Sequence, residues 1–362
     1  MSNSFSAYEL AAGVETLPIS SAAPAPDAER LRTSYLDLLR LCLCDLDGHG
    51  TPSASRDEQG RVSWSQLADD QGLKMRAAGL DWPLNGISMV GLSRLRDLQS
   101  LVEQIVADGV EGDLIEAGAW RGGASIMMRA TLDSLGDERT VFVADSFEGF
   151  PEPGRIAGGP EERIDLRGIE LLMVPKEQVA ANFRKFGLEE RVRLIQGYFE
   201  DTMDSLRGGK WGLIRLDGDT YDATRACLDA LYPGLAVGGY VVIDDYLLID
   251  ECKQAVTDFR AEHSIEDEIV EVDWNAAKWR RTEAGPTNGQ GEPDFSSTTG
   301  ISLGEVTSSG EVPILADRGE IDVRDEIERV EQRLEEVERE IAEAETGGVA
   351  GLRSSFRSGA ER

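Results

Sequence analysis

Lysine and histidine are scarce in this chain of 362 residues, and acids far outnumber bases. Arginine supplies most of the 37 basic residues, 68 residues are acidic, and the formal net charge is -31. Phosphate contacts need a basic surface, so this charge excludes nucleic acid and anionic membranes as expected partners. High salt would screen the repulsion between so many carboxylates, and the composition therefore favours a salt-adapted (halophilic) organism.

Cysteine and long apolar runs are also lacking. The four cysteines form no C-x-x-C pair and have only His49 nearby, which excludes a zinc site and predicts buried thiols. No run approaches 18 apolar residues, and the N-terminus has no basic segment followed by an apolar one. We therefore expect neither a membrane span nor secretion, and predict a cytoplasmic protein.

The stretch DLIEAGAWRGG, residues 113–123, is the most informative motif. An apolar strand runs into a glycine-rich turn and then into the helical sequence ASIMMRATLDSL. Gly118, Gly122 and Gly123 allow close approach of a ligand, and Asp145, at the end of the next apolar run, can accept hydrogen bonds from ribose hydroxyls. The motif favours a nucleoside-containing cofactor, although tight packing of strand on helix uses the same residues.

Two later apolar runs, WGLIRLDGDTYDAT and GGYVVIDDY, also end in carboxylates. Strand ends of an open parallel sheet meet at one edge, and several acids there repel one another unless a cation intervenes. Asp217, Asp244 and Asp245 offer the hard oxygen ligands that Mg²⁺ prefers. The alternative is that Asp217 and Asp219 cap the next helix and that the other two acids form a turn. The acids expected at this edge are Glu116, Asp145, Asp217, Asp244 and Asp245.

Strand and helix patterns alternate through the middle of the chain. This alternation predicts an α/β fold with a doubly wound, mostly parallel sheet. Apolar runs at 268–274 and 276–282 predict a terminal antiparallel hairpin, which is typical of methyltransferases rather than dehydrogenases. The expected strands and helices lie at 113–118, 122–135, 140–145, 177–187, 191–196, 201–206, 211–217, 221–232, 238–244 and 251–262.

The segments before the sheet have their own signatures. Residues 1–28 are rich in Ala, Ser and Pro and predict a flexible arm. Residues 29–46 predict an amphipathic helix that packs on the sheet or on a second subunit, and 47–72 predict a polar loop. The insertion 151–175 is long and glycine-rich, which indicates a lid over an acceptor.

The segments after the sheet predict a separate module. Residues 283–312 have the composition of a linker, and 313–346 carry the a/d heptads of a coiled-coil helix. Residues 347–362 predict a flexible tail. We expect a homo-oligomer held by the N-terminal helices, the C-terminal coiled coil or both.

Five ordered motifs together resemble the macrocin O-methyltransferase family: DWPLNGISMVGLSRLRDLQ, DLIEAGAWRGGASIMMRA, VADSFEGFPEP, RLDGDTYDAT and GGYVVIDDY. The resemblance runs from about Tyr35 to Arg281. It implies a class I, Rossmann-like methyltransferase domain over 29–282, with S-adenosylmethionine and Mg²⁺ as cofactors. The implied acceptor is a sugar hydroxyl of a glycosylated natural product or a surface glycan.

The resemblance also implies a site. Asp145 and Ser146 would lie at the ribose, Met89–Gly91 at the methionine end and Gly197–Phe199 at the adenine. Mg²⁺ would bind Asp217, Asp244 and Asp245, with Asp217 also the first candidate for the catalytic base. The implied cofactor-binding residues are Met89, Val90, Gly91, Glu116, Gly118, Trp120, Arg121, Gly122, Asp145, Ser146, Gly197, Tyr198 and Phe199.

One departure from the family pattern concerns the base. The macrolide enzymes are associated with a lid histidine, whereas residues 151–175 contain none. Asp165, Glu161 or Glu162 could act instead, the acceptor could differ, or the metal could do more of the work.

Other functions stay open at the level of the sequence. The first alternative is a catechol or phenol methyltransferase, since the vicinal hydroxyls of a catechol acceptor chelate the same metal. The second is an NAD-dependent dehydrogenase, which would use the same glycine turn. The third is a non-catalytic scaffold that displays the coiled coil. The chain offers no evident pair of residues for hydride transfer, and an idle site has no reason to keep three mutually repelling acids.

Overall fold

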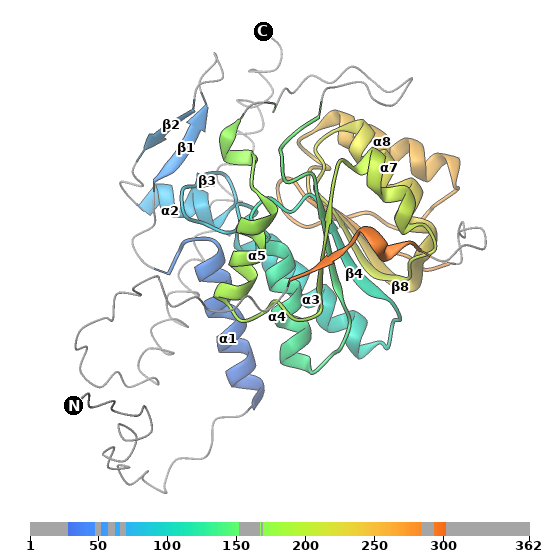
Figure 1. Cartoon of the computed structure of the whole chain (residues 1–362), viewed down its shortest axis with the longest axis horizontal. Coiled ribbons are helices and arrows are strands. Elements are labelled where there is room, and N and C mark those ends of the chain that lie inside the picture. Colours follow the sequence, from blue (N-terminus) through green and yellow to red (C-terminus); the bar gives the residue numbers. More distant parts are fainter. Residues whose placement is uncertain are drawn as a thin grey trace, which may run out of the picture.

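A computed structural model describes residues 28–47, 52–56, 62–65, 70–151, 167, 169–283 and 293–301. Its centre is an eight-stranded sheet in the order β11-β6-β5-β4-β7-β8-β10-β9 (Figure 1). The strands β4 to β8 are parallel, and the other three pair antiparallel with their neighbours. The strands are β4 (Asp113–Ala117), β5 (Val141–Asp145), β6 (Val192–Gln196), β7 (Trp211–Leu216), β8 (Leu235–Ile243), β9 (Val270–Glu271), β10 (Ala277–Arg280) and β11 (Thr299–Gly300). The predicted doubly wound sheet and its terminal hairpin are confirmed.

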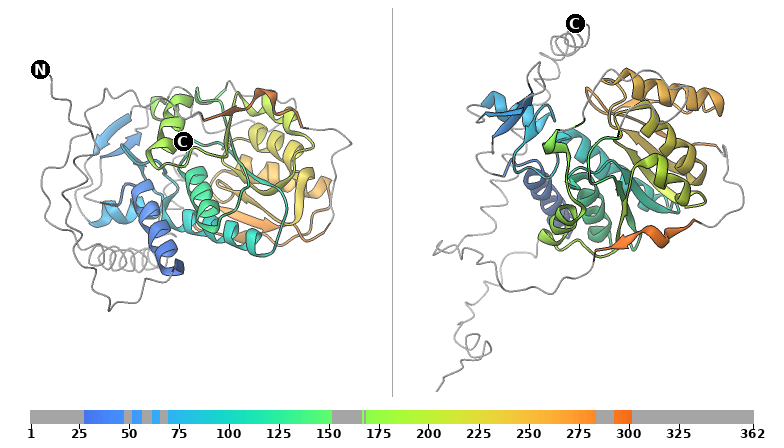
Figure 2. Two further views of the ribbon diagram at one scale, coloured as in Figure 1. Left: turned by 60° about the horizontal axis from the view of Figure 1, so that its bottom comes forward. Right: turned by 45° about the horizontal axis from the view of Figure 1, so that its top comes forward.

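Helices cover both faces of this sheet (Figure 2). Successive residues of a strand point to opposite faces, so Leu114 joins one hydrophobic core and Ile115 the other. The first face carries α1 (Ala28–Leu43), α3 (Gly91–Ala107), α4 (Gly123–Leu135) and α5 (Lys176–Lys185). The second carries α7 (Tyr221–Leu231) and α8 (Asp250–Glu262), with the short α6 (Phe199–Thr202) and the 3₁₀ turns η3 (Met203–Leu206) and η4 (Tyr232–Gly234) beside them.

Local signals explain where the helices that flank the site begin. Gly122 has φ +87° directly before α4, a conformation that costs glycine little. The side chain of Thr220 accepts a hydrogen bond from Ala223 N at 3.1 Å and caps α7. Thus the cap of α7 is Thr220, and the carboxylates of Asp217 and Asp219 are not its N-cap.

A second, small sheet lies beside the first, in the order β2-β1-β3. Its strands are β1 (Ser53–Arg56), β2 (Val62–Ser65) and β3 (Trp82–Pro83), and the helix α2 (Asp70–Ala77) follows β2. The polar loop expected over 47–72 therefore contains two strands and the start of a helix. Four-residue polar strands carry too little periodicity to be recognised in a sequence.

The segment after the hairpin returns to the sheet. Residues 295–297 form the 3₁₀ turn η5 (Phe295–Ser297), and β11 then pairs antiparallel with β6. The Phe295 ring lies 5.0 Å from that of Phe142, and Asp294 N donates to Ser205 O at 2.8 Å. This differs from the linker expected over 283–312, because residues 293–301 belong to the domain.

Several predicted segments lie outside the described residues. These are the coiled coil at 313–346, the tail at 347–362, the arm apart from Ala28, which opens α1, and most of the lid at 151–175. Within the described part of the lid, η2 (Glu170–Leu172) is a single 3₁₀ turn. Among the helices that the structure describes, none has the length and apolar character needed to cross a membrane.

Candidate active site

The glycine-rich turn and the acidic end of β7 touch through their backbones. Gly118 has φ +91°, and a Cβ atom there would lie 1.8 Å from the carbonyl oxygen of Asp217. Only glycine fits such an approach. Asp217 N also donates to Ala117 O at 2.8 Å, which continues the pairing of β4 with β7 past its last residue. The predicted cofactor turn and the first predicted metal ligand are therefore immediate neighbours.

Asp145 lies beneath the turn. Its Oδ2 accepts from Ala119 N at 2.8 Å and Trp120 N at 3.3 Å, and its Oδ1 accepts from Phe147 N at 2.8 Å. Burial raises the pKa of Asp145, while these three amides oppose that rise. The adjacent Ser146 hydroxyl donates to Gly149 O at 2.7 Å. The carboxylate thus fixes the turn. Two amides occupy both lone pairs of Oδ2, whereas Oδ1 accepts from one amide and is the oxygen available to a ribose hydroxyl.

The other predicted cofactor segments border the same turn. A Cβ on Gly123, the first residue of α4, would lie 2.6 Å from Ile87 O, so the segment that leads to Met89–Gly91 packs on the start of α4. On the opposite side, Gly197 N donates to Asp145 O at 3.0 Å. Tyr198 follows and precedes α6, and the Phe199 ring reaches to 3.5 Å from the Cβ position of Gly218. The structure therefore gathers these segments around one turn.

Trp120 and Arg121 direct their side chains toward neighbouring loops. Trp120, with φ +47°, donates from Nε1 to Leu171 O at 2.8 Å. The Arg121 guanidinium lies 4.2 Å from the Trp120 ring and donates to the carbonyls of Pro83, Leu84 and Gly86 at 3.2, 2.8 and 2.6 Å. Arg121 thus holds the loop before α3 against the turn, and Trp120 holds the segment around Leu171.

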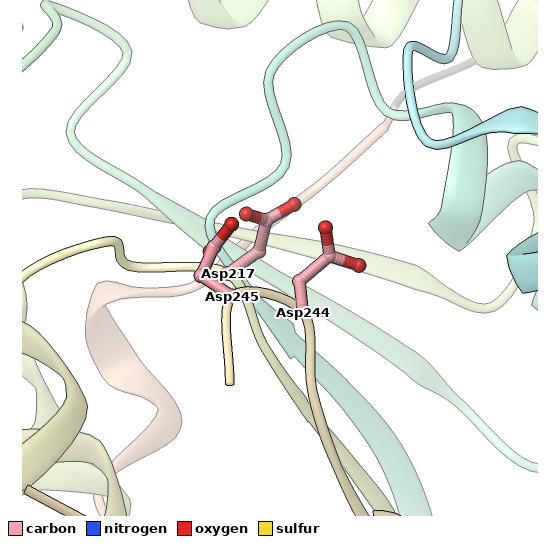
Figure 3. Close-up of side chains that lie close together, drawn as sticks. All are labelled: Asp217, Asp244 and Asp245. Carbon is pink, nitrogen blue, oxygen red and sulfur yellow. The ribbon is translucent and has the colours of Figure 1, made fainter. Parts of the chain in front are cut away.

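The three predicted metal ligands come together at the ends of β7 and β8 (Figure 3). One carboxylate oxygen from each of Asp217, Asp244 and Asp245 lies within 4.8 Å of the others. Asp244 and Asp245 are buried, and the side chain of Asp217 is 27% exposed. Asp217 is therefore the acid of this trio most open to an acceptor.

Two arginines that sequence reasoning missed hold these acids. Arg215 donates from Nη1 to Glu116 at 2.6 Å and Asp217 at 3.0 Å, and from Nη2 to Asp244 Oδ1 at 2.5 Å. Arg94, in the first turn of α3, contacts Asp244 Oδ2 through Nη1 and Asp273 Oδ2 through Nε at 2.9 Å. The signal was present in WGLIRL, since a charged residue inside a buried strand needs a buried counter-ion.

Further polar residues around Asp245 were also missed. Asn275 donates from Nδ2 to Asp245 Oδ1 at 3.0 Å and accepts from Leu248 N at 3.1 Å. Asp219, with φ +59°, brings its carboxyl within hydrogen-bonding reach of Asp245. Two ionised carboxylates repel at this range unless a proton or a cation lies between them.

The pKa values of this cluster follow from burial and charge. Burial and the neighbouring Asp244 raise the pKa of Asp217 to about 6, and burial and Asp217 raise the pKa of Asp219 to about 8. Burial also raises the pKa of Asp245 well above its ordinary value, with Asp219 adding to it. Burial opposes ionisation of Asp244 too, but Arg215 and Arg94 outweigh it and lower that pKa.

This donor set fits a divalent cation. The Oδ2 atom of Asp245 is buried and receives no hydrogen bond from any N–H or hydroxyl group in the described residues. It points to a ligand that supplies positive charge, and carboxylate oxygens are the hard donors that Mg²⁺ prefers. Asp217, Asp244 and Asp245 would hold such an ion.

The structure describes one of the two histidines, His263, and it is not bonded to the acid cluster. His263 follows the last turn of α8, where its ring lies 4.5 Å from that of Phe259. His49 lies outside the described residues. The acids of the cluster are therefore the titratable groups that the described structure places beside the glycine turn.

The sheet order, the glycine turn after the first parallel strand and the acidic strand ends define a class I methyltransferase. The chain belongs to the macrocin O-methyltransferase (TylF) family, whose sequence model matches residues 34–281. It is thus an S-adenosylmethionine-dependent O-methyltransferase, and the dehydrogenase and scaffold alternatives fall away.

Relatives of known function support this assignment. The chain is 44% identical over 259 residues to a Streptomyces olivaceus 8-demethyl-8-(2,3-dimethoxy-alpha-L-rhamnosyl)-tetracenomycin-C 4'-O-methyltransferase, covering 71% of this chain and 95% of that protein. It is 38% identical over 251 residues to the demethyldecarbamoylnovobiocin O-methyltransferase of Streptomyces niveus, covering 68% and 93%. The solved O-methyltransferase NovP superimposes with a TM-score of 0.61 at 36% identity, covering 70% of this chain and all of that one.

Proposed function

We propose that this enzyme transfers the methyl group of S-adenosylmethionine to a sugar hydroxyl of a glycosylated natural product, with Mg²⁺ bound by Asp217, Asp244 and Asp245. The observation that carries the proposal is the backbone contact between Gly118 and Asp217. It sets the cofactor turn directly against the acid cluster. A methyl donor in the turn and a hydroxyl at the acids would then be neighbours, as an in-line displacement requires.

The names of the relatives support the acceptor class. One relative acts on a rhamnosyl tetracenomycin, and another, 41% identical over 212 residues, is the mycinamicin III 3''-O-methyltransferase of Micromonospora griseorubida. Both names describe natural products, and the first names a sugar. A glycosylated small molecule is therefore the acceptor to test first, with a surface glycan as the second.

The residues of the chain divide the work as follows. Asp145 and the glycine turn would orient the cofactor through its ribose, and Arg215 keeps Glu116, Asp217 and Asp244 in fixed positions. When bound, Mg²⁺ supplies the Lewis acidity that lowers the pKa of an acceptor hydroxyl. Exclusion of water by the buried strand ends strengthens every charge interaction in the site.

Proton removal falls to Asp217 or Asp219. Asp217 is the more constrained of the two, because it accepts a hydrogen bond from Arg215 and would also bind the metal. Asp219 lies two residues further on, is partly exposed, and has its pKa raised by burial and by Asp217 to about 8. A raised pKa near neutrality suits a general base.

Calorimetric titration tests the cofactor and metal together. S-adenosylmethionine and S-adenosylhomocysteine are titrated into the purified protein at molar salt, with and without Mg²⁺. We expect micromolar binding of both and a separate heat for Mg²⁺. A folded protein that binds neither nucleoside would overturn the proposal.

Acceptor assays then decide the substrate class. Rhamnosylated polyketides, their aglycones and a simple catechol are compared by mass spectrometry of the methylated product. We expect product only from the glycosides and only when Mg²⁺ is present. Methylation of catechol at a comparable rate would move the enzyme to the phenol-directed class.

A further inference from the structure

Among the described residues, two buried arginines form ion pairs with the acid cluster, and they are outnumbered by its carboxylates. Six carboxylates gather near the strand ends, with Arg94 and Arg215 as the guanidinium groups bonded to them. The six acids are Glu116, Asp217, Asp219, Asp244, Asp245 and Asp273. Such an excess of negative charge needs a cation, protons or both for the cluster to stay folded.

Asp244 is held from two sides. Arg215 reaches it along the sheet, because Arg215 is the register partner of Glu116 on β4 and faces the same side of the sheet as α3. Arg94 reaches it from α3. We call these two residues the guanidinium clamp. Each oxygen of Asp244 accepts from one of the clamp's guanidinium groups.

Burial makes the clamp strong. The side chains of Arg215, Arg94 and Asp244 are 3%, 7% and 5% exposed. Water can neither screen these contacts nor replace a lost partner, so removal of one member leaves an uncompensated buried charge. Arg94 also stacks 5.2 Å from the Trp274 ring and binds Asp273 on the terminal hairpin. One side chain therefore joins α3, β8 and the hairpin.

We propose that Arg94 and Arg215 are positioning residues that keep the acid cluster assembled without a metal and thereby limit how tightly a divalent cation binds. This rests on the proposed function in one respect, namely that the cation site is the one formed by Asp217, Asp244 and Asp245. The two guanidinium groups already neutralise part of the negative charge that a cation would neutralise. Their positive charge repels an incoming cation while they preserve the geometry that the cation needs.

Arg94 is the member to vary, because it lies at a helix start rather than in the central strand. Arg94→Gln removes the charge, and Arg94→Lys keeps it. Arg40→Gln is the matched control, since Arg40 is also buried on a helix and pairs with an aspartate, Asp37, outside the site. For each protein we measure the Tm in chelator and the Kd for Mg²⁺ by calorimetry.

Arg94→Gln is expected to lower the Tm in chelator and to bind Mg²⁺ about tenfold more tightly, because a repelling charge is gone from a poorly screened site. Saturating Mg²⁺ should restore most of the lost Tm. Arg94→Lys should have a Tm in chelator and a Kd for Mg²⁺ close to those of the wild type. Arg40→Gln should lower the Tm without changing the Kd and without rescue by Mg²⁺.

Asp273→Asn is an independent variant, and its expected effect on Mg²⁺ affinity is opposite to that of Arg94→Gln. It removes a negative charge near the cluster and leaves Arg94 to Asp244, so Mg²⁺ should bind more weakly than in the wild type. If Arg94→Gln does not fold, the Kd of Asp273→Asn for Mg²⁺ tests the proposal. Weaker Mg²⁺ binding in Arg94→Gln, or no change of Kd in Asp273→Asn, overturns the proposal.

Different measurements would refute the proposed cation site and the proposed role of the guanidinium clamp. If Mg²⁺ gives no heat of binding and no change of Tm in the wild-type protein, there is no cation site. The proposed limit on cation affinity then fails with it. The Tm in chelator still decides the assembly role, since a clamp predicts a larger loss for Arg94→Gln than for Arg40→Gln. An equal loss in both variants refutes that role even if Mg²⁺ binds.

Discussion

At the scale of single residues, substitution of Asp217 and of Asp219 tests which acid binds the metal and which removes the proton. Asp217→Asn should weaken Mg²⁺ binding at least about tenfold and abolish metal-dependent turnover, because a ligand oxygen is lost. Affinity for S-adenosylhomocysteine should stay within a few fold. Calorimetry with both ligands and a kcat measurement check this. Unchanged turnover would show that Asp217 is not a ligand.

Asp219→Asn is expected to behave differently from its neighbour. It should keep the affinity for Mg²⁺ within a few fold and lower kcat by roughly 10²–10⁴, the usual contribution of a general base. Steady-state kinetics at saturating Mg²⁺ provide the measurement. If Asp219→Asn instead loses Mg²⁺ and Asp217→Asn keeps a high kcat, the two roles are reversed.

The acids could be predicted from the sequence, whereas their partners could not. Asp217, Asp244 and Asp245 each follow an apolar β-branched run, and the parallel sheet brings such ends together. Arg215 lies 99 residues from Glu116 in the chain, and Arg94 lies 150 residues from Asp244. Ion pairs over such separations depend on tertiary packing, which no local pattern encodes. In the sequence, Arg94 appears only within the family motif DWPLNGISMVGLSRLRDLQ.

At the scale of elements, β11 and η5 close the edge of the sheet beside β6. A chain cut after Glu283 loses β11 and the ring contact between Phe295 and Phe142, whereas a chain cut after Ile301 keeps both. We expect the shorter chain to be less stable by about 1–2 kcal/mol, since a partly buried phenylalanine and two strand residues are removed. Denaturant unfolding of the two truncated chains gives the comparison, and Phe295→Ala in the longer chain isolates the ring. Equal midpoints would mean that β11 adds nothing to stability.

Long elements were predictable and short ones were not. The five parallel strands and the helices α4, α5, α7 and α8 follow from apolar periodicity over five or more residues. The strands β1, β2 and β11 have two to four residues each, and their pairing partners rather than their own side chains create them. For this reason the segment 283–312, which has the composition of a linker, contains the strand β11.

At the scale of the whole molecule, the acid cluster links stability to pH. Asp217, Asp219 and Asp245 have raised pKa values, so the folded protein holds protons that the unfolded chain releases near the ordinary value of 3.8. Stability without a cation should therefore fall as the pH rises from about 4 to above 8. At the proposed metal site, Mg²⁺ would replace those protons, and its effect on the Tm should be larger at pH 8 than at pH 6. Thermal scans with Mg²⁺ and with chelator test this, and a Mg²⁺ effect that shrinks with pH would contradict it.

Self-association is the second property of the whole molecule. The exposed face of α1 carries Leu31, Tyr35 and Leu38, which are 45%, 43% and 44% exposed. Removal of residues after Ile301 should lower the oligomeric state if the heptads at 313–346 form a coiled coil. Sedimentation of the full and shortened chains measures this, with S-adenosylhomocysteine binding as the control for folding. If the shortened chain sediments as the same oligomer, Leu31→Asp with Leu38→Asp tests whether α1 holds the subunits together.

The contact between Gly118 and Asp217 also bears on how such an enzyme diversifies. No side chain lies between the two turns at this contact, so their spacing is set by backbone atoms as long as residue 118 is glycine. The loop at 83–86 and the segment around Leu171 lie on the outer side of the turn, tied to it by Arg121 and Trp120. Under the proposed function, exchange of these outer loops by evolution or by a protein engineer would admit a new acceptor while the distance between methyl donor and receiving oxygen stays constant.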